Sequence, residues 1–151
     1  MLRRYTPPVQ IELLRSDVAS LKVDAIVNPR LAREREVDPY SRPAEVATGN
    51  LLCKFVIETI LPPPGAPGAE HHLQVTTRSA LRRAEALAIG SVAFPPCHTL
   101  AGLSALVCAR VMMAATLDFA PQAHSLQQVV FCAFTESAYA SLQQALRELQ
   151  H

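Results

Sequence analysis

The fold is decided by the stretch Ile11-Glu-Leu-Leu-Arg-Ser-Asp17-Val-Ala-Ser-Leu-Lys-Val-Asp24-Ala-Ile-Val-Asn28. Val9, Ile11 and Leu13 alternate with polar residues, which is the period of a half-buried strand. The later run Ala25-Ile-Val is wholly apolar and is stopped by Pro29, as is typical of a fully buried strand. The stretch therefore predicts two strands separated by a short connection.

Strand and helix patterns alternate along the rest of the chain. Further strands are predicted at residues 53–59, 91–94 and 129–134, and helices at residues 72–90, 101–119 and 135–149. Gly90 is predicted to end the first helix and Thr135 to cap the last one. Residues 61–68 form a proline- and glycine-rich loop, and residues 30–49 an irregular surface connection. This alternation predicts a single α/β domain, residues 1–151, with a parallel or mixed sheet covered on both faces.

Charge and hydropathy limit the classes of partner. Lys and Arg number 14 against 13 Asp and Glu, a net charge of +1, so neither nucleic acid nor a membrane surface is the predicted partner. No apolar run of signal-peptide length follows Met1, which predicts a cytoplasmic protein. The apolar residues 101–117 contain Arg110 and are interpreted as a buried helix rather than a membrane span.

The four cysteines are widely spaced and form no CxxC pair, so no zinc or redox motif is predicted. We expect each of them to be a reduced thiol in an apolar surrounding. Cys97 and His98 are adjacent and point apart, so they form no thiolate–imidazole pair. The sequence thus predicts no metal, no cofactor and no catalytic residue.

The order of segments resembles that of the macro domain, the ADP-ribose-binding module. The stretch from Ile11 to Asn28 is similar to the opening of that family, and Lys54-Phe-Val-Ile-Glu-Thr59 resembles its central strand. Residues 72–95 resemble the next helix and strand, and residues 129–149 the closing strand and helix. The resemblance implies a three-layer α/β/α sandwich with a mixed central sheet.

The chain departs from the family where the ligand's phosphates are held. In typical members the strand that ends in Val-Asn is followed by a second asparagine, a run of glycines and a helix. Here the corresponding residues are Pro29-Arg-Leu-Ala-Arg-Glu-Arg-Glu36, without glycine and with Leu31 at the asparagine position. Only glycine allows the backbone to approach a phosphate so closely. Glu58 also replaces the family's central-strand histidine, so the resemblance implies a domain without catalysis, although the enzyme question stays open.

Five ligand-site residues survive under the resemblance, namely Asp17, Asn28, Thr99, Gly102 and Phe134. Asp17 stands where the family's aspartate accepts from the adenine amino group, and a helix-capping or turn role is the alternative. Asn28 either braces the sheet end near the ribose or stabilises a loop. Phe134 either stacks on adenine or packs in the core.

Two functional hypotheses follow from these residues. The first is a non-catalytic module that binds ADP-ribose or another adenine nucleotide weakly. The second is a scaffold of the same fold that binds a protein partner, or a second copy of itself, with no nucleotide. An ADP-ribosyl hydrolase is a distant third.

Overall fold

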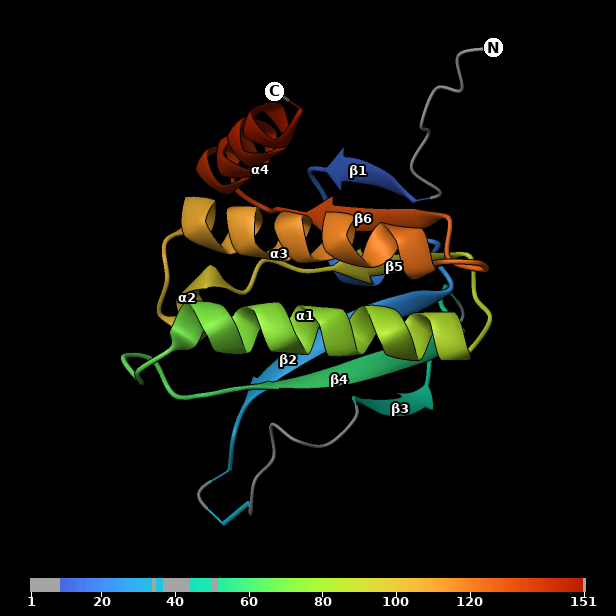
Figure 1. The fold of residues 1–151 in the computed structure, drawn as a ribbon, viewed down its shortest axis with the longest axis horizontal. Helices are drawn as coiled ribbons and strands as arrows, with labels where there is room; N and C mark the ends of the chain where they lie inside the picture. The colour runs from blue at the N-terminus through green and yellow to red at the C-terminus, as the bar shows by residue number, and fades with distance from the viewer. Residues whose placement is uncertain (1–8, 34, 37–43, 50–51, 151) are drawn as a thin grey trace.

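The computed structural model describes residues 9–33, 35–36, 44–49 and 52–150 of the chain. In these residues six strands form one sheet in the order β1-β6-β5-β2-β4-β3 (Figure 1). The strands are β1 (Gln10–Leu14), β2 (Ala25–Leu31), β3 (Glu45–Thr48), β4 (Phe55–Leu61), β5 (Ser91–Phe94) and β6 (Gln128–Cys132). Only β3 runs antiparallel to its neighbour, and the other described pairs are parallel. The predicted α/β fold with a mixed sheet is therefore confirmed.

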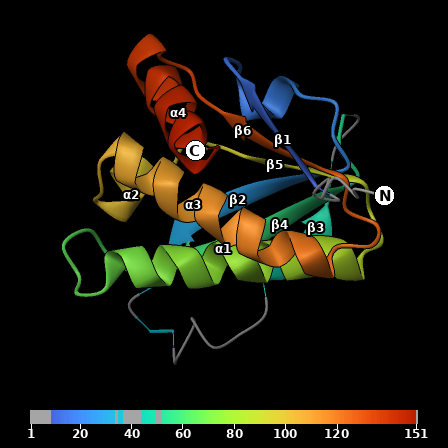
Figure 2. The ribbon, with the colours of Figure 1, turned by 45° about the horizontal axis from the view of Figure 1, so that its top comes forward.

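The longer helices lie together on one face of the sheet. The helical elements are α1 (Ala69–Ala86), α2 (His98–Ala101), α3 (Ala105–Phe119) and α4 (Glu136–Leu149), with 3₁₀ turns η1 (Val18–Ser20) and η3 (Ala120–Gln122). α1 and α3 lie side by side in front of the sheet, and α4 packs against α3 near β1 (Figures 1 and 2). No helix in the described ranges is long and apolar enough to cross a membrane.

The core fills the space between the sheet and these helices. Ile57 of β4, Val92 of β5 and Phe131 of β6 are buried there against Leu81 of α1 and Met113 of α3. The rings of Phe94 and Phe131 stack with their centroids 5.4 Å apart. Because strand residues alternate between faces, every second residue of these strands points the other way.

The opposite face is covered unevenly. Over β5 and β6 it carries a small second cluster, in which Ala93, Val130 and Cys132 are buried against Leu14, Val18, Leu21 and Val23. On this face of the sheet, η1 and its flanking residues thus form the covering layer of the predicted sandwich. Over β2 and β4 the same face carries polar side chains, because Asn28 and Arg30 alternate with the core-facing Val27 and Leu31.

Two predictions about residues 30–49 are wrong. β2 does not stop at Pro29 but continues to Leu31, paired with β4. The pairing of β2 with β5 ends at Ile26, so the missing N–H of Pro29 removes no bond from that ladder. A further strand, β3, occupies part of the stretch predicted to be irregular. Residues 34 and 37–43 of that stretch lie outside the described residues.

Helix ends also differ from the predictions. α1 ends at Ala86, and Ala88 takes the left-handed conformation with φ of 55°. Gly90 therefore does not end the helix, and its N–H donates to Asp24 Oδ2 over 2.9 Å. The helix predicted at 101–119 is two helices, because Ser104 caps the start of α3 by accepting from the N–H of Val107. Thr135 caps α4 as predicted, accepting from the N–H of Ala138 over 3.2 Å.

Candidate functional site

The carboxyl ends of the parallel strands meet at one edge of the sheet, where α/β folds place their ligand sites. At one corner of this edge the N–H of Ala133 donates to the carbonyl of Leu14 over 3.0 Å, and Arg15 Nε donates to the carbonyl of Phe134 over 3.5 Å. β1 and β6, which are the first and last described strands along the chain and neighbours in the sheet, therefore bring Asp17 and Phe134 to the same corner.

Asp17 acts as the N-cap of η1. Its Oδ1 accepts from the N–H of Ala19 over 3.0 Å, which confirms the capping alternative. The side chain is exposed, and in the described part of the chain no partner is seen for Oδ2. Burial raises the pKa of the nearby Cys132 thiol to about 11, and the charge of Asp17 adds to this effect. One carboxylate oxygen of Asp17 thus holds the turn.

Phe134 does not pack in the core. Its side chain is 64% exposed at the carboxyl end of β6, so the core-packing alternative is wrong. The exposed phenyl ring offers a stacking surface, and the exposed carboxylate at the same corner of the sheet offers a hydrogen-bond acceptor. These two predicted site residues are the ones that the structure brings together.

The other three predicted residues lie elsewhere. Asn28 is exposed midway along β2, on the face away from α1 and opposite Glu58 of β4. Thr99 is exposed in α2, and Gly102 ends that helix with φ of 70°. A Cβ on Gly102 would lie 3.0 Å from Pro64, so the packing of α2 against the 61–68 loop explains this glycine without a ligand.

Two small hollows lie among the described residues behind this edge. A hollow of about 30 Å³ lies among Pro96, Cys97, Cys108 and Ala133, and one of about 10 Å³ lies between α1 and the ends of β2 and β4. A water molecule needs roughly 10–15 Å³, and ligand pockets usually hold roughly 300 Å³ or more. A larger hollow of about 370 Å³ lies near the amino ends of β2, β4 and β5, lined by Asp24, Ser91 and the only lysines of the chain, Lys22 and Lys54.

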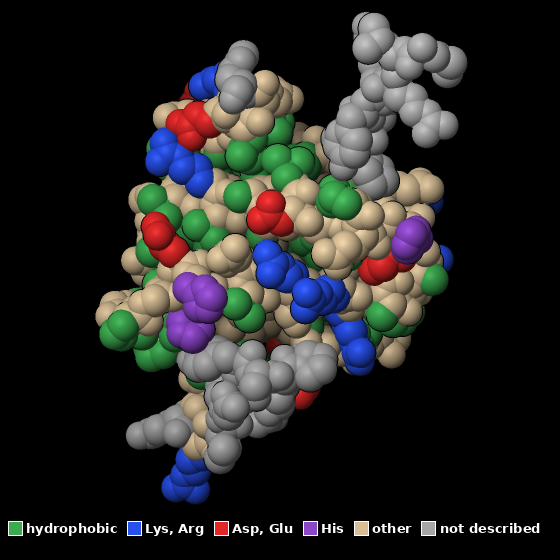
Figure 3. Space-filling view, viewed as in Figure 1, with side chains coloured by type: hydrophobic (Ala, Val, Ile, Leu, Met, Phe, Trp, Pro, Cys, Tyr) green, Lys and Arg blue, Asp and Glu red, His purple; other side chains and the backbone are tan. Residues whose placement is uncertain are grey.

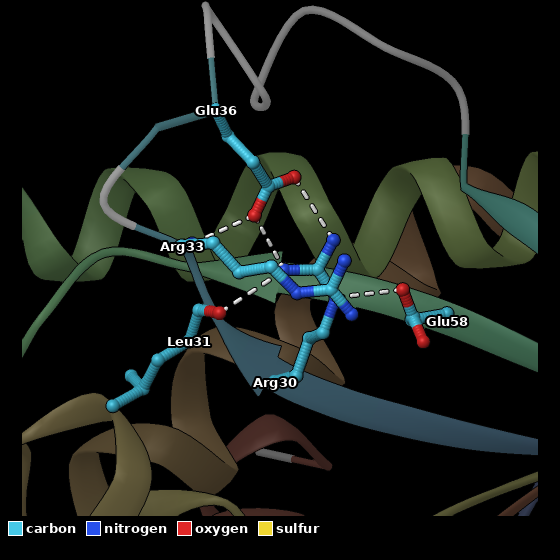
Figure 4. Close-up of polar contacts among 5 residues, drawn as sticks. All are labelled: Arg30, Leu31, Arg33, Glu36 and Glu58. Atoms are coloured by element: carbon cyan, nitrogen blue, oxygen red, sulfur yellow. Dashed lines mark hydrogen bonds and ion pairs between the residues drawn. The ribbon is translucent and has the colours of Figure 1, made fainter.

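Sequence reasoning missed a charge network where the family carries its glycine-rich loop (Figure 4). Arg30 donates through Nε to Glu58 over 2.7 Å, and through its two terminal nitrogens to both oxygens of Glu36 over 2.6 and 2.9 Å. The backbone N–H of Arg33 also donates to Glu36 over 2.7 Å. The hydrogen bonds from Arg30 and then Arg33 lower the pKa of Glu36 to about 2. The mixed charges of residues 30–36 were the available signal.

The cysteines are buried, as predicted, in the described residues. Cys97 Sγ lies 3.7 Å from Met112 Sδ, and its thiol is hydrogen-bonded to Cys108. This hydrogen bond and burial raise the pKa of Cys97, while the same hydrogen bond lowers the pKa of Cys108. Among the described residues no group of three His, Cys, Asp or Glu side chains converges on a metal position.

Comparison with known proteins places the fold. No family model matches the chain. An uncharacterized protein of Sulfurisphaera tokodaii is 25% identical over an alignment 158 positions long, which covers 85% of this chain and 86% of the relative. A macrodomain of Oceanobacillus iheyensis with ADP superposes with a TM-score of 0.82 and 17% identity, over 99% of this chain and 96% of the other. A Trypanosoma brucei macrodomain in complex with ADP-ribose gives 0.75 and 21%, over 90% and 68%. The chain therefore has the macrodomain fold.

Proposed function

We propose that this macrodomain-fold chain is a non-catalytic module that binds the adenosine part of ADP-ribose or a related adenine nucleotide. The observation that carries the proposal is the exposed ring of Phe134 beside Asp17 at the carboxyl edge of the sheet. Solved structures of the same fold contain ADP or ADP-ribose, which supports an adenine nucleotide as the ligand class.

The adenosine end has the groups that recognition needs. An aromatic ring that stacks on a base contributes about 1–3 kcal/mol, and its geometry tolerates small displacements. The free oxygen of Asp17 can accept from the exocyclic amino group of adenine, a charge-assisted bond that contributes about 1.5–3 kcal/mol. Together these contacts select adenine over a flat base that presents only acceptors at that position.

The phosphate end lacks such groups in the described residues. Leu31, at the family's asparagine position, packs against the core, and Arg30 is neutralised by Glu36 and Glu58. A diphosphate would therefore gain little from this loop. We expect affinities in the high micromolar range, on the order of −5 kcal/mol.

Absence of catalysis follows from the same residues. Reaction requires the scissile ribose to be held in one geometry, and small displacements cost orders of magnitude in rate. Neither Leu31 nor the two small hollows behind the carboxyl edge supplies that hold. Incubation of mono-ADP-ribosylated protein with the domain should release no ADP-ribose above background, and release at the rate of an active macrodomain would contradict this part.

Calorimetry with ADP-ribose, AMP and adenosine tests the binding. Asp17→Asn removes the carboxylate but keeps an oxygen that caps η1, and Phe134→Leu removes the ring but keeps an apolar side chain. The parent should bind all three ligands with similar weak affinity, and each variant should lose most of it. A variant that binds ADP-ribose as tightly as the parent would show that the ligand lies elsewhere.

The small volume of the two hollows behind the carboxyl edge, about 30 and 10 Å³, favours the scaffold hypothesis. Its predicted docking surface near residues 101–117 is less favoured, because α3 buries one side in the core, although Leu117 is 36% exposed. The outer surface of the helical layer instead carries basic side chains over α1 (Figure 3), which contributes Arg78, Arg82 and Arg83. No heat with any of the three ligands would favour the scaffold.

A further inference from the structure

Three sulfur atoms converge behind the carboxyl edge of the sheet. Cys97 follows β5 and precedes α2, while Cys108 and Met112 lie four residues apart on the same side of α3. Cys97 Sγ donates to Met112 Sδ over 3.7 Å, and Cys108 lines the same hollow as both. Cys97 therefore stands at one corner of a triangle whose other corners are both on α3.

The spacing fits a metal ion in the plane of the three sulfurs. A metal–thiolate bond is about 2.3 Å long, so three sulfurs around a trigonal ion stand about 4 Å apart. The 3.7 Å between Cys97 and Met112 is close to that separation. Two sulfurs on opposite sides of a linear ion would stand about 4.6 Å apart, which fits less well.

The surroundings select the kind of ion. Cys97, Cys108 and Met112 are 6%, 4% and 6% exposed, and all three line the same 30 Å³ hollow. Phe94, Phe131 and Leu142 are among the apolar residues around it. His98 and Cys132 also line the hollow, but Cys132 is buried in the cluster on the other face of the sheet, and no three described His, Cys, Asp or Glu side chains converge on a metal position. Thiolate and thioether ligands without carboxylates favour soft Cu(I), whereas structural zinc takes four ligands from cysteine, histidine and carboxylate side chains.

We propose that Cys97, Cys108 and Met112 form a three-coordinate site for Cu(I). On binding, Cu(I) gains two Cu–S bonds to thiolates and one to the thioether, and the two thiol protons pass to solvent. No electron is transferred, since the metal enters and stays as Cu(I). The bound ion fixes the start of α2, and with it the 97–102 turn, to α3. This inference goes beyond the nucleotide proposal and depends on none of its residues.

Anaerobic titration of the reduced full chain with Cu(I), in competition with bicinchoninate, tests the site. We expect one tightly bound equivalent with an ultraviolet thiolate-to-copper absorption, and copper X-ray absorption showing three sulfurs at about 2.3 Å. Met112→Leu conserves volume and both thiols, and should weaken binding by at least about tenfold, since loss of even an outer-shell partner costs that much. Cys97→Ala and Cys108→Ala should each abolish the tight equivalent.

The matched controls are the two remaining cysteines and the nucleotide site. Cys53→Ala, Cys132→Ala and Phe134→Leu should each bind one equivalent with the affinity of the parent. Circular dichroism of each variant separates loss of the site from loss of the fold, and Met112→Leu serves where a cysteine variant does not fold. Unchanged affinity in Met112→Leu, or equal loss in Cys132→Ala, would overturn the proposal.

Discussion

The two faces of the sheet differ in how they are stabilised. On one face Ile57 and Leu61 of β4 are buried against α1. On the other face the same strand carries Glu58, which is held by Arg30 of β2. In the family that the sequence resembles, a helix follows the strand corresponding to β2. Here the described residues that follow β2, up to Glu36, cover an ion pair on the sheet.

Compared with the family that the sequence resembles, this chain therefore differs both in the loop after β2 and in the sheet surface next to that loop. A strand residue that lacks a covering helix gains little from being apolar and is better satisfied as a polar group in water. Replacement of the family's histidine by Glu58 is therefore explained by the partner that Arg30 provides. The charge network of Arg30, Glu36 and Glu58 thus stands where the sequence departs from the family it resembles.

The prediction with the largest expected effect compares an isoleucine-to-alanine substitution on each face of β4. Ile57→Ala removes a side chain that is 0% exposed and should lower the free energy of unfolding by about 2–5 kcal/mol. Ile60→Ala lies on the same strand but faces the other way and is half-buried, so about 1 kcal/mol is expected. Urea denaturation measures both. Equal losses would mean that the second face is packed as tightly as the first.

The acid stability of the charge network gives an intermediate effect. The pKa of Glu36 is lowered from 4.5 to about 2, chiefly by the hydrogen bond from Arg30. A lowered pKa in the folded state contributes stability that is present above pH 4.5 and is lost as the pH falls towards 2. Arg30→Gln should therefore lower stability at neutral pH and make its decline between pH 4.5 and 2 shallower.

The matched control for this prediction is the ion pair on the helical face. Arg110 holds Glu148, whose pKa is also lowered to about 2, so Arg110→Gln should flatten the same pH range independently. Unfolding free energies measured at several pH values in both single variants and the double variant decide whether the effects add. A pH profile of Arg30→Gln identical to that of the parent would contradict the role given to the network.

The smallest expected effect concerns Phe134. Because its ring is 64% exposed, Phe134→Ser should change the free energy of unfolding by no more than about 0.5 kcal/mol. Thermal and urea denaturation measure this change. A much larger loss would show that the ring supports the fold, and the reason for assigning it to a ligand would disappear.

Local patterns in the sequence predicted the elements well where each residue acts on its near neighbours. Thr135 was identified as a cap from its position alone, and Asp17 was placed correctly in a turn. The prediction that Gly90 ends the first helix is wrong, because Ala88 takes the left-handed conformation instead. The backbone of Gly90 is held by Asp24, far away in the chain. β3 was missed since its short and largely exposed strand has no apolar period.

The candidate site was less predictable than the fold. Asp17 and Phe134 were named from the resemblance, but the exposure of Phe134 depends on where β6 ends, which the apolar run did not reveal. The Arg30 network and the sulfur triangle join residues from different elements. Such convergence follows from tertiary packing, which no single stretch of sequence encodes.

The pairing of β1 with β6 has a consequence for how the chain is made. Gln10 lies 118 positions before its partner Gln128 (128 − 10), so β1 has no place in the sheet until β6 has emerged. At roughly 5–20 residues per second the delay is about 6 to 24 seconds. During that time β5 also lacks β6, its neighbour on that side. β1 therefore joins the sheet only after β6, and the corner that holds Asp17 and Phe134 cannot form before β6 has been made.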